Sequence, residues 1–249
     1  MCSFLAKPIA LPFICASLGR PGRLVVRHPL DAGPTGNAMF RGPSAAPPAD
    51  PNLHVVAGRA TDRGAVVEAL SDADEAISAL DSRGGGQPGP PCATASGQVI
   101  EVESGRTGFR YVAISATGVK GPPDTTPFLA RLPSRIIPAR LGKTYLDKDA
   151  EAPVLAASSL EWVLIRPPGL TDGPPGGNVH PDATRATGGR ASGGDLSRFA
   201  VLVTTDPTYV RQSPFVAGQR KAPHLGNRPA TPHRNRHRPA YNPVRPTRE

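Results

Sequence analysis

Two glycines, Gly19 and Gly22, stand three residues apart after an apolar segment and before a helix-like one. Backbone N–H groups at the start of a helix bind phosphate, and glycine lets the phosphate approach closely. Arg20 adds positive charge where the helix dipole already favours an anion. The first of three expected glycines is replaced by Cys15 or Ala16, depending on the register, and a Cβ there crowds the turn. The pattern predicts a pyrophosphate-binding turn of reduced affinity at Gly19, Arg20 and Gly22.

Two further residues follow predicted strands and could contact a ligand. Arg41 comes after the predicted strand 35–40, where a guanidinium can pair with the 2′-phosphate of NADP. Because no acidic residue stands there to favour NAD, NADP is the expected cofactor and NAD the less favoured one. Ser115 ends another predicted strand, and its hydroxyl could bond a substrate carbonyl. The alternatives are an Arg41 that is only solvated and a Ser115 that only bonds nearby backbone.

The segments that would position these residues alternate between short apolar runs and helical patterns, which is typical of βαβ units. The predicted strands are 53–57, 75–80, 110–115 and 161–166. We therefore predict an α/β, Rossmann-like, doubly wound and mostly parallel sheet of six or seven strands. Parallel strands are buried on both faces, so the expected core includes Trp162 and the strand residues Leu53, Val55, Ile77, Val112, Ile114, Val163 and Ile165.

The helical patterns are uneven in quality. Thr61 or Asp62 can cap a helix that carries an apolar face, and Ser192 with Asp195 forms a capping box before another. Residues 82–96 are rich in Gly and Pro and are predicted to be a loop, and residues 98–108 are predicted to be a weak helix without an apolar face. Pro153 is expected to break or shorten the helix around it.

The charge of this 249-residue chain is concentrated at one end. The formal net charge is +9, but residues 219–249 hold seven Arg and one Lys against one Glu, which leaves +2 for residues 1–218. We predict a folded domain over 1–218 and a disordered tail over 219–249, because the tail mixes Arg with Pro and lacks apolar periodicity. Nucleic-acid binding is therefore disfavoured, since it would place the basic residues on a folded face.

Cysteine and histidine usage excludes several other classes. Cys2, Cys15 and Cys92 form no C-x-x-C pair, which favours a reducing, cytoplasmic location. The apolar run at 9–18 is interrupted by proline, so a secretory signal is disfavoured, and no run reaches the roughly 18 apolar residues of a membrane span. The histidines are scattered, so no metal site is predicted.

Several segments, taken in order, resemble one protein family. They are 53–58, 60–62, 76–80, 114–119, Tyr145 with Asp147 and Lys148, 160–162, 166–174 and 206–211. This order is similar to that of the atypical short-chain dehydrogenase/reductase group with NmrA-like NAD(P)-binding domains, including the biliverdin reductase B or flavin reductase type. The resemblance implies an oxidoreductase that transfers hydride from NAD(P)H to a small carbonyl, quinone or flavin-like acceptor.

The resemblance also implies roles for individual residues. Lys148 would contact the nicotinamide ribose, and Tyr145 would be a packing or substrate-wall residue, because it stands three residues before Lys148 where the family has four. Leu80 would line the cofactor, and Pro167 and Pro168 would lie over the nicotinamide. Ser115, Tyr145 and Lys148 are thus the candidate catalytic residues.

Departures from the family pattern leave a second interpretation open. Arg59 replaces an expected acidic residue and Asp81 an expected glycine, in addition to the altered glycine turn. These changes also suit a non-catalytic relative that senses a dinucleotide or binds nothing. The composition of residues 84–108 and 219–249 is, in addition, what a shifted reading frame would give, and the nucleotide sequence distinguishes the two explanations.

Overall fold

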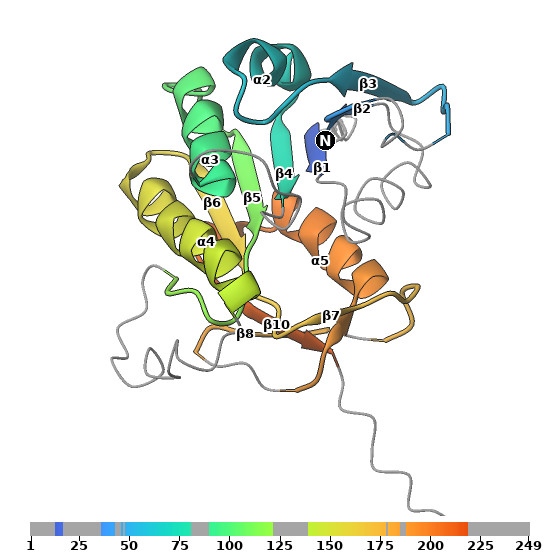
Figure 1. The fold of residues 1–249 in the computed structure, drawn as a ribbon, viewed down its shortest axis with the longest axis vertical. Helices are drawn as coiled ribbons and strands as arrows, with labels where there is room; N and C mark the ends of the chain where they lie inside the picture. The colour runs from blue at the N-terminus through green and yellow to red at the C-terminus, as the bar shows by residue number, and fades with distance from the viewer. Residues whose placement is uncertain are drawn as a thin grey trace, which may run out of the picture.

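The fold is built on a six-stranded parallel sheet, seen in a computed structural model (Figure 1). The model describes residues 13–16, 36–42, 46, 48–80, 90–121, 139–177, 179–184 and 188–218. The strands are β1 (Phe13–Ala16), β2 (Gly36–Phe40), β3 (Leu53–Ala57), β4 (Glu75–Ala79), β5 (Arg110–Ile114) and β6 (Glu161–Ile165). Their order is β3-β2-β1-β4-β5-β6, and every pair is parallel. The predicted Rossmann-like sheet is confirmed.

Helices cover both faces of this sheet. The structure contains α2 (Arg63–Leu70), α3 (Pro91–Val102), α4 (Ala139–Ala157) and α5 (Gly193–Thr205), followed by a 3-10 turn at Pro207–Tyr209. Figure 1 shows α3 and α4 on one side of the strands and α5 on the other. After β3 the chain crosses to the far side of β1, so β1 and β4 flank the switch point at which open α/β sheets bind ligands.

Strand residues alternate between the two faces. Tyr111 and Ala113 pack with Trp162, on the side of α2, α3 and α4, whereas Val112 and Ile114 pack on the side of α5. The predicted core is confirmed for residues of β4, β5 and β6: Ile77, Val112, Ile114, Trp162, Val163 and Ile165.

The core prediction fails at β3. Val55 is 37% exposed and Leu53 is only partly buried. β3 lies at one edge of the described sheet, and an edge strand has fewer elements to cover its faces. β6, at the other edge, stays buried, and residues around Gln212 and Phe215 run alongside it.

Both predicted helix caps are confirmed. The Asp62 carboxylate accepts a hydrogen bond from the Gly64 N–H at 3.0 Å at the start of α2. At the start of α5, Ser192 Oγ accepts from the Asp195 N–H at 3.0 Å and donates to the Asp195 carboxylate at 2.7 Å. Local sequence signals were sufficient here because each cap lies within three residues of its partner.

The predictions for residues 82–96 and 98–108 are partly wrong. Residues 91–96, expected to be loop, and residues 98–102, expected to be part of a weak helix, form a single helix, α3, which begins at Pro91, and residues 103–108 are not helical. Proline is favourable at a first helical position because no N–H is needed there. α3 also has a buried face, made of small residues that include Cys92, Ala95, Ser96 and Val99. These small side chains let α3 pack closely against α4. A search of the sequence for large apolar residues does not detect such a face.

The expected break at Pro153 is also wrong, because α4 runs through it from Ala139 to Ala157. Pro153 is exposed, while its neighbours Ala152 and Leu155 are buried against the sheet. Packing on that face outweighs the hydrogen bond that proline removes.

Two small sheets lie beyond the carboxyl end of β6. β7 (Leu170–Thr171) pairs in parallel with β9 (Ala191–Ser192), and β8 (Val179–Asp182) pairs antiparallel with β10 (Phe215–Gly218). Gly19, Arg20, Gly22 and the predicted tail 219–249 lie outside the described residues. No helix in the described part of the chain has the length and apolar character needed to cross a membrane.

Candidate functional site

Lys148 joins the carboxyl ends of two neighbouring strands. Its side chain extends from α4 and is buried, with 7% exposure. The Nζ ammonium donates to the carbonyl oxygen of Ile114, the last residue of β5, at 2.6 Å, and to that of Leu80, just after β4, at 3.0 Å. The sequence-predicted residues Leu80 and Lys148 are therefore brought into contact, at the edge of the sheet where this fold binds ligands.

Ser115 lies immediately beyond the same strand. Its N–H donates to the Ile165 carbonyl at 2.7 Å, which extends the pairing of β5 with β6 by one residue. Strand alternation directs its side chain to the face covered by α3 and α4. The residue is 5% exposed, and its hydroxyl has no hydrogen-bond partner in the described part of the chain. A buried hydroxyl without a partner is costly unless a ligand supplies one.

Tyr145 lies one turn before Lys148 on α4 and is half-buried. Its ring packs directly on the backbone at Gly118, where a Cβ atom would be only 2.6 Å from Tyr145 Cε1. Gly118 is thus required for this contact, and Tyr145 forms part of the wall beside the segment that follows β5.

The segment after β6 is tied to the segment after β5. Pro167 is buried and its carbonyl accepts from the Thr117 N–H at 3.1 Å, whereas Pro168 is exposed. Arg166, 1% exposed, donates from Nε to the Ser213 carbonyl at 2.8 Å and from Nη1 to the Val119 carbonyl at 3.2 Å. These bonds fix the carboxyl ends of β5 and β6 relative to each other.

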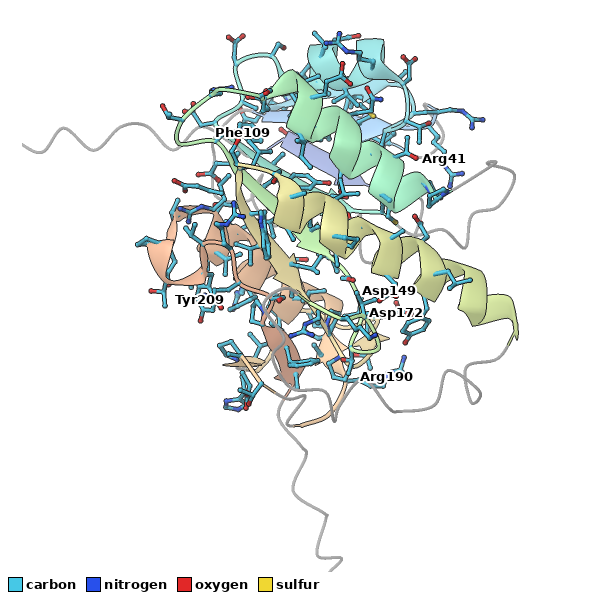
Figure 2. The ribbon with its side chains drawn as sticks, turned by 90° about the vertical axis from the view of Figure 1, so that its left-hand side faces the viewer. Arg41, Phe109, Asp149, Asp172, Arg190 and Tyr209 are labelled. Carbon is cyan, nitrogen blue, oxygen red and sulfur yellow. The ribbon has the colours of Figure 1, made fainter. Side chains whose placement is uncertain are left out.

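Arg41 follows β2 directly and is exposed. Figure 2 shows it on the side of the molecule opposite Phe109, which precedes β5, so Arg41 lies on the side of the carboxyl ends of the strands. Cys15 pairs with Met39 and Ser78 inside the sheet, and Ala16 is the last residue of β1. The predicted glycine turn that follows lies outside the described residues.

Sequence reasoning missed a buried polar cluster between α3, α4 and β5. The Asp147 carboxylate accepts from the Cys92 N–H at 2.9 Å and from the Ala93 N–H at 3.3 Å, at the start of α3. The Glu151 carboxylate accepts from Ser96 Oγ at 2.6 Å. The signal was present in the sequence, because Lys148 and Glu151 occupy the same helical stripe as the buried Ala152 and Leu155.

The protonation chemistry of this cluster is set mainly by burial. Burial raises the pKa of the Glu151 carboxyl above its ordinary value, and the nearby Lys148 charge and the Ser96 hydrogen bond act in the opposite direction. Burial also raises the pKa of the Cys92 thiol far above its usual range. Cys92 is therefore a neutral packing residue and not a nucleophile.

Comparison with solved structures identifies the fold. ChuY, described as an anaerobilin reductase from Escherichia coli O157:H7, is 23% identical, with a TM-score of 0.67 over 83% of this chain and 97% of ChuY. SP1627 of Streptococcus pneumoniae, a proposed NADH-flavin reductase, is 15% identical, with a TM-score of 0.64 over 82% of this chain and 97% of that one. A proposed epimerase from Bacteroides thetaiotaomicron is 16% identical, with a TM-score of 0.68 over 84% and 97%. At these identities the likeness shows the fold alone.

A comparison of the sequence with protein families gives the more specific result. No curated protein matches the chain. The model of the NAD(P)H-binding family matches residues 17–207, which span both the predicted glycine turn and the Lys148 site. The resemblance to the atypical short-chain dehydrogenases implied the same ligand. The chain belongs to the NAD(P)H-binding family.

Proposed function

We propose that the chain is an oxidoreductase that uses NADPH to reduce a small carbonyl, quinone or flavin-like acceptor. The observation that carries the proposal is the Ser115 hydroxyl, which has no hydrogen-bond partner among the described residues and lies beside the end of β5, where Lys148 is anchored. Both groups are buried at the edge of the sheet where a Rossmann fold binds its ligand. The Lys148 ammonium suits binding of the nicotinamide ribose, and the Ser115 hydroxyl suits polarisation of the oxygen of an acceptor that receives hydride from NADPH.

The roles follow from the geometry. A bound nicotinamide dinucleotide supplies the hydride. Lys148, held by the carbonyls of Leu80 and Ile114, retains N–H donor capacity for a ribose hydroxyl. Ser115 Oγ donates a hydrogen bond to the acceptor oxygen as it gains negative charge. Tyr145 and Pro167 form walls that exclude water, and Pro168 lies at the rim.

The contacts proposed for the phosphate groups of the cofactor use charge. Gly19, Arg20 and Gly22 bind the pyrophosphate, and Arg41 pairs with the 2′-phosphate of NADPH. The Cβ of Ala16 restricts close approach of the pyrophosphate, so we expect weaker binding than a turn with three glycines would give. The absence of the first glycine from the sequence also favours a second candidate function, a non-catalytic relative that senses a dinucleotide or binds nothing.

Titration of the purified chain with NADPH and with NADH, followed by nicotinamide fluorescence, tests the cofactor proposal. Arg41→Ala should weaken NADPH binding at least tenfold more than NADH binding, because only NADPH carries the 2′-phosphate. Equal losses would remove Arg41 from the site. Oxidation of bound NADPH on addition of a quinone or a free flavin would support the enzyme, and saturable binding without turnover of any acceptor would support the sensor.

A further inference from the structure

A buried arginine neighbours the Ser115 hydroxyl across two strands. β5 and β6 are parallel, with Ile114 opposite Ile165. The Ser115 N–H bonds the Ile165 carbonyl at 2.7 Å, so the pairing continues past the end of β5. The next residues of the two chains are Ser115 and Arg166, and parallel pairing directs both to the same face of the sheet. The proposed reaction gives Arg166, which is 1% exposed, no role.

The Arg166 guanidinium is held in one orientation by its surroundings. Its Nε and Nη2 donate to the Ser213 carbonyl at 2.8 and 2.5 Å, and its Nη1 donates to the Val119 carbonyl at 3.2 Å. Its Cζ lies 3.8 Å from the centre of the Phe215 ring. At Gly121, a Cβ atom would be 2.9 Å from the same Cζ, so a larger residue there would displace the guanidinium or Ser213.

The bond to Val119 reaches the turn that follows Ser115. The Val119 N–H donates to the Ala116 carbonyl at 3.0 Å, which closes a turn over residues 116–119. Ser115 leads directly into this turn, and the far end of the turn is fixed by a charged donor from the end of β6. Bonds from a planar guanidinium are charge-assisted and fix both distance and angle.

We propose that Arg166 is a positioning residue, whose guanidinium holds the turn 116–119 against the end of β6 and thereby sets the direction in which Ser115 Oγ donates. This inference rests on the proposed function where it concerns the acceptor, because Ser115 is there the donor to the acceptor oxygen. Arg166 acts through the turn, since the donors described above bond backbone carbonyls.

The direction of the Ser115 hydroxyl affects the rate because only a donor aligned with the developing charge stabilises the transition state. A displacement of about 1 Å can cost up to about a hundredfold in rate. Lysine at position 166 keeps the charge, but its single nitrogen on a flexible stem does not reproduce the fork that joins Val119 to Ser213. NADPH binding does not use this hydroxyl in the proposed reaction and should be unchanged.

A double-mutant cycle separates positioning from a merely structural role. With NADPH and either riboflavin or menadione as the acceptor, Arg166→Lys should lower kcat by about tenfold and change the Kd of NADPH less than twofold. In the Ser115→Ala background the same change should lower kcat less than twofold, because no hydroxyl remains to be directed. Gly121→Ala should repeat this pattern, since it displaces the guanidinium without removing it. Equal losses of kcat with and without Ser115 would overturn the proposal.

Arg110→Lys is the matched control. Arg110 is also buried, at 8% exposure, and also bonds backbone carbonyls, those of Val203 and Asp206, but it does so at the start of β5. Its melting temperature should fall as that of Arg166→Lys does, with kcat unchanged at temperatures well below both transitions. A loss of kcat as large as that of Arg166→Lys would show that general destabilisation explains both, and the proposal would be wrong.

Hydrogen exchange gives a readout that needs no acceptor. The Val119 amide should exchange at least about tenfold faster in Arg166→Lys than in wild type, and at the wild-type rate in Arg110→Lys, because only the first change releases the turn 116–119. Unchanged exchange in Arg166→Lys would refute the hold of Arg166 on this turn. Faster exchange in a chain that oxidises NADPH with neither riboflavin nor menadione would support that hold and refute the proposed function instead.

Discussion

The Lys148 ammonium lies 2.6 Å from the carbonyl oxygen of Ile114, at the point where β5 ends. A carbonyl at the end of a strand has no N–H of a neighbouring strand to accept from, and here the Lys148 side chain of α4 supplies the donor. The same nitrogen bonds the carbonyl of Leu80 beyond β4, so one cation satisfies the ends of two adjacent strands.

We expect Ser115→Ala to leave stability nearly unchanged, within about 0.5 kcal/mol, because the removed hydroxyl has no partner in the described residues. Ser96→Ala is the matched control. It removes the hydrogen bonds to Glu151 and Tyr111 and should cost about 1–3 kcal/mol. Urea denaturation measures both, and an equally large loss in Ser115→Ala would show that the Ser115 hydroxyl stabilises the fold.

Asp147→Ala should destabilise the protein by about 2–3 kcal/mol, because three charge-assisted contacts to the start of α3 are lost in a buried setting. The comparison variant is Asp62→Ala, which removes the exposed cap of α2 and should cost about 1 kcal/mol. Chemical denaturation followed by circular dichroism distinguishes them. Equal losses of stability in the two variants would mean that the buried contact of Asp147 with α3, which joins residues 55 positions apart, contributes no more than the exposed local cap at Asp62.

Pro153→Ala should raise the unfolding free energy by about 2–3 kcal/mol. The new N–H can bond the carbonyl of Asp149 one turn earlier, and the exposed side chain leaves the core unchanged. Pro168→Ala is at an exposed position outside any helix. It should instead lower the unfolding free energy by no more than about 1 kcal/mol, because it only raises the conformational entropy of the unfolded chain. A destabilised Pro153→Ala would contradict a continuous α4.

Glu75 is predicted to make stability depend on pH. Burial raises the pKa of its carboxyl, against the Thr204 hydrogen bond and the Arg110 charge, and Glu75 Oε2 has no partner in the described residues. A raised pKa means that the stability present below the unfolded-state value, about 4.3, is lost as the pH rises through the folded-state value. Glu75→Gln should therefore flatten the fall in melting temperature above pH 4.5. The same change at exposed Glu101 serves as the control, and identical profiles would refute the prediction.

The sequence carried enough information for the sheet and for two helices. Strands such as 110–115 and 161–166 are short apolar runs, and the caps at Asp62 and Ser192 act over three residues or fewer. These signals are local. The position of Ser115 could be anticipated because the carboxyl ends of parallel strands meet at one edge, whereas Lys148 was indicated by the family resemblance.

The parts that could not be predicted depend on contacts distant in sequence. α3 has a buried face of small residues, and its first N–H groups bond a carboxylate 55 residues away. Glu151 shares a helical stripe with Ala152 and Leu155, but its hydrogen-bond partner Ser96 lies 55 residues earlier in the chain, on α3. The continuity of α4 through Pro153 likewise follows from burial of Ala152 and Leu155 against the sheet, which local propensity does not include.

Asp147 and Lys148 are consecutive residues that reach in different directions, one to the start of α3 and the other to the ends of β4 and β5. Rotating α4 by one residue, about 100°, would break both sets of bonds at once. These bonds therefore hold α4 against rotation and sliding. If Lys148 contacts the ribose as proposed above, that end of the site is preorganised and little conformational entropy is lost there on binding, so closure over a substrate is expected from segments other than α4.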